Sequence, residues 1–494
     1  MCRKPRPVCP AKSCHTSKIF LHTLGQCFGF ALAPILVMAR RSNPEKPGDV
    51  SNNVLQFQKK GKAFVETHGW LQTILLIVGG ITVLAVFGAL FIAAGTEPPS
   101  ITTDAPVAPV GSALFAESLS HLVNAPIGQG GTVTILNNGD EFLPALIDAI
   151  DNARKTINFS VYIWNNGSFS DQVLGALLRA RSRNVAVRLL LDDFGSKDVS
   201  FGKFDELKEA GGKVASFRTP QFGKWTRLHR RDHRRSIVID GEFGFTGGMA
   251  VKDTWLGNAQ DEDHWRDMMF KVTGPMARSL QAAFVSSWVG SSGEILVGEE
   301  MYPNSGQTAP GVERFIHLVN SPAADSYAMA EFYLLPIMAA RKSLLIVTPY
   351  FIPDKYLQAA LIDKARHGVD VRLLVPGKHI DNRFVRLSAQ ANYEDLLKAG
   401  VKIYEYRPAF LHSKYMVVDG EWSVIGSPNL NYRSRQLDEE NAMGIFDKRL
   451  GAQLSDEFHA DVKQSDEIHL EQWERRNVFV RFAQRLAQIL DKQS

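Results

Sequence analysis

The chain is 494 residues long and 45% hydrophobic, with 56 Lys and Arg residues against 52 Asp and Glu residues. This length accommodates more than one domain, and this apolar content excludes a largely disordered chain. The net charge of +4 is unevenly distributed: residues 1–62 carry eleven basic and two acidic residues (+9), which leaves 45 against 50 (−5) elsewhere. An acidic folded region disfavours nucleic acid as the partner, because nucleic-acid enzymes meet phosphates with a basic surface.

Residues 1–70 are predicted to form a basic tail, which holds all four cysteines of the chain (Cys2, Cys9, Cys14 and Cys27). No disulfide or cysteine ligand is therefore available to the later folded region. The sequence also lacks a His-Glu-x-x-His helix, so we expect neither a metal nor another cofactor. A weakly apolar stretch at 19–39 is open to three interpretations: a signal-like region, an interfacial helix or a poor membrane span.

Residues 71–95 (LQTILLIVGGITVLAVFGALFIAAG) form an uncharged apolar run that predicts a transmembrane helix. About 25 residues are enough to cross roughly 30 Å of hydrocarbon with some tilt. Basic residues precede the run up to Lys62, and none follows until Arg154, so the positive-inside rule places the N-terminus in the cytoplasm. Everything after residue 95 would then lie across the membrane, and a second span at 19–39 would not change that side.

Residues 96–112 (TEPPSITTDAPVAPVGS) are rich in Pro, Thr and Ser and predict an extended linker. Beyond the linker the chain repeats itself, and the matching segments occur twice in the same order. ARKTINFSVYIW (153–164) matches ARKSLLIVTPYFI (340–352), and VAVRLLLDD (185–193) matches VDVRLLVPG (369–377). A repeat of this kind indicates a duplicated structural unit.

We place the first half at residues 113–300 and the second half at 301–494. Within each half, a helix-like stretch precedes a short run rich in Val, Ile and Leu, which indicates α/β layers with helices covering a buried sheet. The second half ends in WERRNVFVRFAQRLAQIL, whose apolar residues recur at helical spacing. This C-terminal helix is expected to cap the domain by packing, with contact to lipid as the alternative.

Each half also contains one copy of a polar motif. His233-x-Arg235-x4-Asp240 is followed by Gly247-Gly248, and His412-x-Lys414-x4-Asp419 by Gly426-Ser427-x-Asn429. Both copies turn through Asp-Gly between two apolar strands, which predicts a hairpin. Two such halves packed face to face would bring His233 and His412 into one active site.

Two histidines with Arg235 and Lys414 provide what displacement at a phosphodiester requires. One neutral imidazole attacks phosphorus, the protonated other donates its proton to the leaving oxygen, and the cations stabilise the phosphoryl oxygens. An incoming alcohol then gives transfer, and water gives hydrolysis. The catalytic candidates are therefore His233, His412, Arg235, Lys414, Asp240 and Asp419, although an Asp that opens an Asp-Gly turn is typical of a structural role.

Other polar residues near the motifs are candidates for supporting roles. Ser427 and Asn429 offer polar contacts at the phosphate or between the halves, and Gly247 and Gly248 allow close backbone approach. Asp267 and Glu440, each downstream of a motif, are candidates for orienting the imidazoles, because a carboxylate on the far ring nitrogen fixes the tautomer. The basic run between Lys224 and Arg235 is either a solvated loop or an anion-binding patch facing the membrane.

The second motif, HSKYMVVDGEWSVIGSPN, resembles the His-Lys-Asp signature of the phospholipase D superfamily. Within it, the chain is similar to bacterial cardiolipin synthases from about Ala113 to the C-terminus. The resemblance rests on four segments: WRDMMFKVTGP (265–275), PYFIPD (349–354), FLHSK (410–414) and NLNYRSRQLDEEN (429–441). It implies two phospholipase D-type α/β/α sandwich halves that form one active site without a metal.

The resemblance also implies an activity: phosphatidyl transfer between two phosphatidylglycerol molecules through a phosphatidyl-histidine, at a bacterial inner membrane. His233 would be the nucleophile and His412 the general acid and base. The first motif departs from the family pattern at Arg235, where Lys is usual, and at Ala250, which stands where the second motif has Asn429. The alternatives are hydrolysis of a phosphodiester, as in a phospholipase D or a nuclease, and an inactive lipid-binding protein.

Overall fold

The computed structural model describes residues 74–85, 103, 105–217, 230–303, 310–321 and 327–491. The chain divides into two compact units, residues 1–95 and 96–494. Of the predicted transmembrane segment 71–95, residues 74–85 are described, and they form a helix whose side chains are exposed. Among the described residues, no helix has the length and apolar character required to cross a bilayer. The remainder of that segment and the stretch 19–39 lie outside the described residues.

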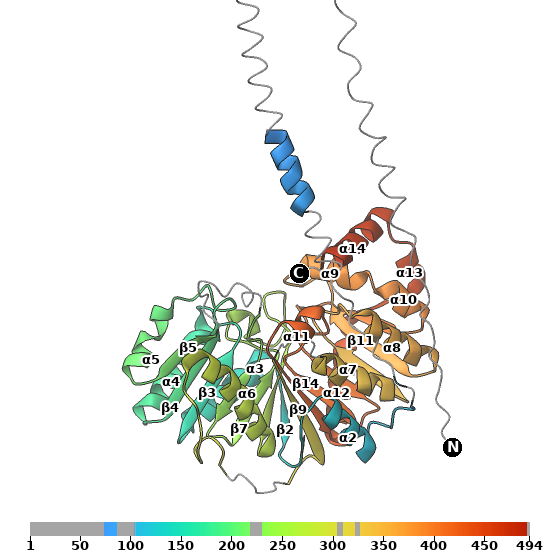
Figure 1. The fold of residues 1–494 in the computed structure, drawn as a ribbon. Coiled ribbons are helices and arrows are strands. Elements are labelled where there is room, and N and C mark those ends of the chain that lie inside the picture. The colour runs from blue at the N-terminus through green and yellow to red at the C-terminus, as the bar shows by residue number, and fades with distance from the viewer. Residues whose placement is uncertain are drawn as a thin grey trace, which may run out of the picture. The chain divides into compact units, whose positions relative to one another are not determined.

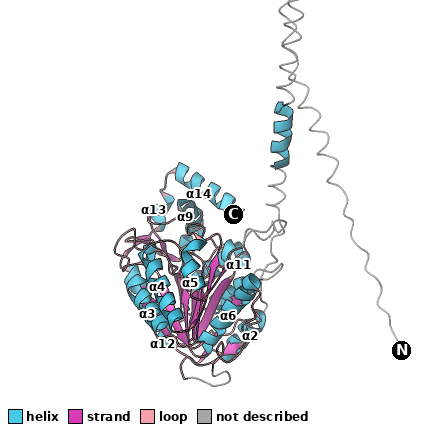
Figure 2. Ribbon diagram, turned by 90° about the vertical axis from the view of Figure 1, so that its left-hand side faces the viewer, coloured by secondary structure: helices cyan, strands magenta, loops and turns pink. Residues whose placement is uncertain are grey.

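The second unit is built on two mixed β-sheets flanked by helices (Figures 1 and 2). The seven-stranded sheet of the first half runs in the order β2 (Val133–Asn137), β8 (Met268–Thr273), β7 (Phe243–Gly247), β6 (Ser236–Ile239), β3 (Thr156–Val161), β4 (Ala186–Asp192) and β5 (Lys213–Phe217). Its helices are α3 (Asn138–Asp151), α4 (Ser168–Ser182), α5 (Asp205–Glu209) and α6 (Pro275–Ser292), with short 3₁₀ turns at Phe201–Phe204 and Asp253–Trp255.

The second half repeats this order and extends it at both edges. Its nine strands run β1 (Ile127–Gly128), β9 (Arg314–Asn320), β15 (Glu440–Phe446), β14 (Trp422–Gly426), β13 (Tyr415–Val418), β10 (Ser343–Val347), β11 (Asp370–Pro376), β12 (Lys402–Tyr406) and β16 (Ser465–Ile468). Its helices are α7 (Ala328–Ala339), α8 (Lys355–Arg366), α9 (Arg383–Gln390), α10 (Tyr393–Lys398), α11 (Tyr432–Gln436), α12 (Lys448–Val462), α13 (Leu470–Glu474) and α14 (Val478–Asp491). Strands β3, β4 and β5 are parallel to one another, as are their equivalents β10, β11 and β12. The hairpin strands β6 and β13 run antiparallel to β3 and β10.

The strands are apolar because both faces of each sheet are covered, as the sequence predicted. In β10, Leu344 and Ile346 face a core that includes α7 and α8, whereas Leu345 and Val347 face a cluster shared by the two halves. That shared cluster also contains side chains of α6 and α12, so these two helices lie on the inner faces of their sheets. Helices α3 and α4 cover the other face of the first sheet. The duplicated α/β/α architecture is confirmed.

The start of the folded region differs from the prediction. Helix α2 (Ala113–Leu122) and strand β1, which we assigned to the first half, pack with the second half: Phe115 contacts the rings of Trp422 and Phe446, and β1 pairs with β9. The end of the predicted linker packs there too, because Val110 is buried in the second core. Pro-rich composition reports backbone stiffness and does not reveal whether an extended segment lies on a core.

The Asp-Gly turns explain why each motif ends in aspartate. Asp240 sits at φ 54° after β6, and its carboxylate accepts hydrogen bonds from the backbone N–H groups of residues 154, 155 and 156 at 2.7–2.8 Å. Asp419, also at φ 54°, binds the backbone N–H groups of residues 341, 342 and 343 in the same way. Both carboxylates therefore lock a hairpin to the start of the neighbouring strand, at the end of the hairpin away from the histidine.

We expect Asp240→Ala to lower the free energy of unfolding by about 2–4 kcal/mol, because it removes three charge-assisted hydrogen bonds and forces alanine into a left-handed conformation. Asp240→Asn keeps an acceptor and tolerates the positive φ, so its loss should be smaller. Thermal unfolding of both variants measures the difference. A large loss of turnover in Asp240→Asn without a loss of stability would contradict the structural role.

Candidate active site

The two histidines lie where the halves meet, and each is held by backbone of the other half. The segment before His233 forms a parallel bridge between Asp232 and Glu439, and His233 N–H donates to the carbonyl of Glu439 at 3.0 Å. Likewise, Arg266 bridges Leu411, and His412 N–H donates to the carbonyl of Arg266 at 2.7 Å. These reciprocal bridges place the two motifs in one site.

The orienting carboxylates are crossed between the halves. Glu440 of the second half lies 3.0 Å from Nδ1 of His233, and Asp267 of the first half lies 2.6 Å from Nδ1 of His412. Sequence reasoning placed each acid downstream of a motif, and it found the two residues but not the crossing. A carboxylate on Nδ1 favours the tautomer with the proton there, which leaves the Nε2 lone pair for chemistry.

Each carboxylate is held by a second contact. Ser427 donates its hydroxyl to Glu440, so this serine supports the histidine-orienting acid. The equivalent position in the first half is Gly248, where a Cβ atom would clash with the carboxylate of Asp267. Gly247 is constrained too, because at φ 146° its Cβ would meet the Met268 carbonyl. Asp267 instead receives a hydrogen bond from the indole Nε1 of Trp255 at 2.8 Å.

Arg235 and Lys414 occupy equivalent places beside the imidazoles. Arg235 Nη1 donates to the carbonyl of His233 at 2.6 Å, and Lys414 Nζ donates to the carbonyl of His412 at 2.5 Å. Lys414 Nζ also lies 3.0 and 3.1 Å from the two ring nitrogens of His412. Burial, with the neighbouring Arg235 charge opposing the pull of Asp267, lowers the pKa of Lys414 to about 7.

Both imidazoles are buried among cations. Burial, followed by the charges of Arg235 and Lys414, lowers the pKa of His233 well below its ordinary value. Burial and Lys414 lower the pKa of His412 to about 3. Aromatic rings contribute to this burial: Trp255, Trp265 and Phe410 lie with ring centroids 5.4–5.5 Å from that of His412. Both rings therefore favour the neutral form at pH 7.

The pKa values of the two carboxyl groups shift in opposite directions. Burial raises the pKa of Glu440 to about 7, against the lowering effect of its contact with Ser427. Burial alone would also raise the pKa of Asp267, but His412 and Lys414 outweigh it, and the resulting pKa lies below the ordinary value. Asp267 is thus the firmer anion, which favours His412 as the ring that gains a proton during the reaction.

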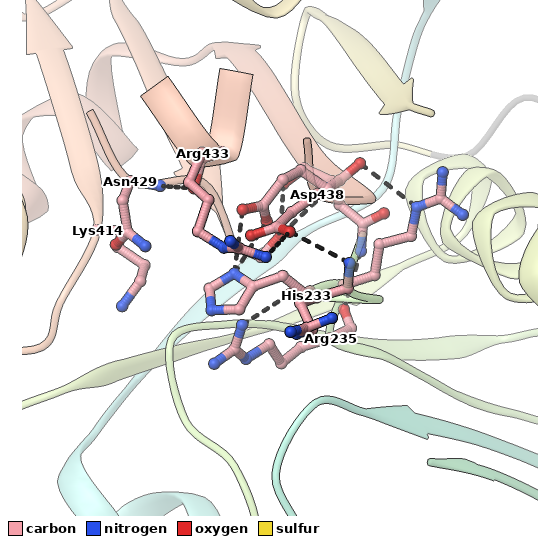
Figure 3. A network of polar contacts seen from close by, with 12 residues as sticks. His233, Arg235, Lys414, Asn429, Arg433 and Asp438 are labelled. Carbon is pink, nitrogen blue, oxygen red and sulfur yellow. Dashed lines mark hydrogen bonds and ion pairs between the residues drawn. The ribbon is translucent and has the colours of Figure 1, made fainter. Parts of the chain in front are cut away.

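Figure 3 shows the remaining polar groups around His233. Arg433 reaches from α11 towards the imidazole and binds Asp438 at 3.0 Å. The buried side-chain Oδ1 of Asn429 has no hydrogen-bond partner in the described part of the chain. At the corresponding position of the first motif, Ala250 packs in the apolar core. At this position of the motif, therefore, the second half has an amide and the first half has an apolar side chain.

Nothing in this set resembles a metal site. Within the described ranges, no three His, Cys, Asp or Glu side chains are grouped so as to hold a metal ion. Asp267 and Glu440 are each paired with an imidazole, and Arg235 and Lys414 each bind the backbone carbonyl of a histidine. This donor set fits an anion such as a phosphodiester.

The sequence matches a family model described as cardiolipin synthase, PLD-like domain, over residues 146–288 and 334–462. The chain is 31% identical to cardiolipin synthase 1 of Bacillus anthracis over 374 residues, which cover 74% of this chain and 73% of the relative. The chain belongs to the phospholipase D-like cardiolipin synthase family.

Other comparisons agree with this membership. Cardiolipin synthase 2 of Bacillus anthracis is 33% identical over 359 residues, covering 72% of this chain and 69% of the relative, and cardiolipin synthase 1 of Staphylococcus epidermidis is 32% identical over 377 residues, covering 74% and 75%. The crystal structure of phosphatidylserine synthase from Haemophilus influenzae superposes with a TM-score of 0.59 at 17% identity. It covers 76% of this chain and 98% of that chain, and shows that the fold is shared.

Two tyrosines that the sequence analysis did not identify flank the histidines. Tyr162, directly after β3, has its ring centroid 4.9 Å from that of His233, and Tyr350, after β10, lies 6.4 Å from His412. Tyr350 donates its hydroxyl to Asp381 at 2.6 Å. Both tyrosines belong to the repeated segments 153–164 and 340–352, so the repeat carried a signal that could have identified them.

The basic run before the first motif includes a buried residue. Its members Lys224 and Arg227 lie outside the described residues. Arg234 is buried and ties the halves together, because its guanidinium binds Ser287 of the first half at 2.8 Å and Glu439 of the second at 2.9 Å. A contiguous stretch of arginines therefore includes at least one residue with a role in assembling the site.

Proposed function

We propose that this protein is a membrane-anchored cardiolipin synthase that converts two phosphatidylglycerol molecules into cardiolipin and glycerol through a phosphatidyl-histidine intermediate. The observation that carries the proposal is the pair of buried imidazoles, each backed by a carboxylate from the other half and flanked by Arg235 and Lys414. The relatives named cardiolipin synthase, each 31–33% identical to this chain, supply the reaction class.

In the first step, Nε2 of His233 attacks the phosphorus of the donor lipid, and the bond from phosphorus to the glycerol headgroup breaks. The departing glycerol oxygen takes a proton from His412. That proton requires His412 to be cationic in the complex, and the bound phosphodiester favours this by offsetting the charge of Lys414 that depresses its pKa. Arg235, Lys414 and the amide of Asn429 hold the non-bridging oxygens.

In the second step, neutral His412 takes the proton from a terminal hydroxyl of the second phosphatidylglycerol. The resulting nucleophile attacks phosphorus, the phosphorus–nitrogen bond breaks, and His233 returns to its neutral form. The product is cardiolipin. His412 regains in the second step the proton that it gave up in the first. Water in place of the second lipid gives phosphatidic acid, so exclusion of water by the acceptor decides between transfer and hydrolysis.

For the location, we propose a bacterial inner membrane, with residues 71–95 as a single span and the second unit on the extracytoplasmic side. Support comes from the uncharged run itself and from the basic residues that precede it. The partners are then phospholipid and membrane, and nucleic acid is not expected. Protease protection in sealed spheroplasts, followed by detection of a C-terminal tag, tests this orientation.

The activity is tested by incubating the purified full-length protein with acyl-labelled phosphatidylglycerol in mixed micelles and separating the lipids by chromatography. We expect labelled cardiolipin together with one glycerol released per cardiolipin formed. Phosphatidic acid as the sole product would assign hydrolysis instead. Retained lipid with no turnover would assign an inactive lipid-binding protein and overturn the proposal.

A further inference from the structure

Helix α14 packs against the rest of its unit through its polar and small side chains. Gln484 and Ala487 are each 2% exposed. Gln484 donates to the side chain of Gln390 in α9 at 3.1 Å, and Gln488 donates to Asn392 at 2.7 Å. Figures 1 and 2 both show α14 lying along α9. The predicted packing of this helix against the domain is confirmed, although polar and small side chains make the contact.

The apolar side chains of α14 instead point away from its packing face. Val478 is 69% exposed, Phe479 78%, Phe482 68% and Leu486 45%. At 100° per residue these four lie on one side of the helix, roughly opposite Gln484 and Ala487. Neighbouring Phe384 of α9 is also exposed. A helix that buries glutamines and exposes phenylalanines is shaped for an apolar environment outside the protein.

This exposed face is flanked by basic residues. Arg475 is exposed just before α14 and Arg485 is exposed on the helix, whereas Asp491 at the last position is the sole acidic residue of α14. Arg383 is exposed at the start of α9. An amphipathic helix with aromatic residues on one side and arginines beside them matches an anionic lipid surface.

The face also lies close to the active site. Helix α9 begins two residues after Asp381, which accepts the hydroxyl of Tyr350 next to His412 and whose charge acts on Lys414. Figure 1 shows α9 and α14 together at one end of the second unit, with α11, which carries Arg433 of the site, below α9. A surface against this end would therefore meet the approach to the histidines.

We propose that Val478, Phe479, Phe482 and Leu486 of α14, together with Phe384 of α9, form a membrane-docking surface that seats the active site on an anionic bilayer. The inference deepens the proposed function, on which it rests for the lipid substrate. Docking would draw donor and acceptor lipids from the bilayer into the site without full transfer through water. It acts in addition to any anchor in residues 71–95.

The test uses the full chain reconstituted in vesicles of phosphatidylglycerol and phosphatidylethanolamine. The variant is Phe479→Ser with Phe482→Ser, and the matched control is Leu114→Ser with Leu122→Ser, because these leucines are 63% and 45% exposed on α2 at the opposite end of the unit. One readout is crosslinking by a phospholipid with a photoreactive acyl chain, mapped by peptide. The other is cardiolipin formation from the vesicles and from short-chain phosphatidylglycerol dissolved as monomers.

We expect crosslinks on residues 478–486 of the unmodified protein and of the α2 control. The α14 variant should lose these crosslinks and form cardiolipin from vesicles about tenfold more slowly. Its rate on monomeric lipid should equal that of the unmodified protein. This combination separates docking from chemistry, because the soluble substrate does not need a membrane surface.

Three results would overturn the docking surface. If the unmodified protein has no crosslinks at α14 and the α14 variant keeps its activity on vesicles, no lipid covers the helix. An equal loss on vesicles and on monomers shows that the helix shapes the site itself. If the unmodified protein has no crosslinks at α14 and the α14 variant unfolds at a lower temperature, another part of the chain covers the helix. If no cardiolipin forms from either substrate, the proposed function fails while the crosslinks still decide the docking surface.

Discussion

Replacing His233 by alanine is expected to abolish the covalent intermediate and to lower cardiolipin formation by about 10⁴-fold or more. The imidazole is neutral in the buried site, and Glu440 at 3.0 Å holds its Nδ1, so the Nε2 lone pair is available to attack phosphorus. His412 has a comparable arrangement with Asp267, but the lowered pKa of Asp267 favours His412 as the proton donor, which leaves His233 as the nucleophile. Acyl-labelled phosphatidylglycerol and product separation measure the loss.

Replacing His412 by alanine should be as damaging with phosphatidylglycerol but for a different reason. The variant keeps the nucleophile and lacks the proton donor for the glycerol oxygen. A donor with p-nitrophenol in place of glycerol needs no proton to leave, because p-nitrophenolate is a stable anion. With this donor, His412→Ala should release about one equivalent of p-nitrophenolate per protein and then stop, since the second step also requires the base.

The same donor separates the two roles. His233→Ala should show no burst, and mass spectrometry of His412→Ala should find the phosphatidyl group on the peptide that contains His233. A burst in His233→Ala with the group on His412 would exchange the two assignments. Full activity of either variant with phosphatidylglycerol would show that the two-histidine mechanism is wrong.

Much of this site could be predicted because the chain contains it twice. The spacing of His, cation and Asp, repeated with an Asp-Gly turn and flanking strands, identified both hairpins and both histidines. It also placed Asp240 and Asp419 at the opening of Asp-Gly turns, where a structural role is more typical than a catalytic one. The repeat also predicted that the two halves share one α/β architecture, since equal segments in equal order build equal sheets, but it did not give the strand order.

The crossing of the carboxylates could not be predicted in this way. It depends on the bridges from Asp232 to Glu439 and from Arg266 to Leu411, which join residues far apart in the sequence. Proximity along the chain suggested the wrong partner for each acid. The orientation of α14 was missed for a related reason: helical periodicity shows that an apolar face exists but does not say what covers it.

Arg266 shows what stabilises the crossing. Its guanidinium binds Asp461 at 3.0 Å and Glu457 at 3.0 Å, both on α12 of the second half, and its backbone carbonyl accepts the N–H of His412. Arg234 of the first half likewise binds an acid of the second half, Glu439. The residue beside each orienting acid therefore anchors the halves together, so the geometry of catalysis and the packing of the halves are set by the same segments.

The second large effect is expected from the orienting acids. Asp267→Asn should lower cardiolipin formation by about 10²–10⁴-fold, because an amide neither stabilises the imidazolium of His412 nor enforces the tautomer that the carboxylate selects. Glu440→Gln should cause a loss of the same order by disturbing His233. Trp255→Phe, which removes the hydrogen bond to Asp267 and part of the ring packing beside His412 but keeps the carboxylate, should cost about tenfold and serves as the milder control.

The crossed arrangement makes an unusual prediction about which step each acid serves. With the p-nitrophenol donor, Asp267→Asn should keep its burst, because the residue belongs to the first half but supports the proton donor of the second. Glu440→Gln should lose most of its burst, because it supports the nucleophile. Removing Asp267 also removes the anion that raises the pKa of His412, so less of this ring is protonated at a given pH and the pH profile of turnover should shift to lower pH. If each acid served the histidine of its own motif, the two burst results would be exchanged, and the duplicated halves would carry self-contained sites.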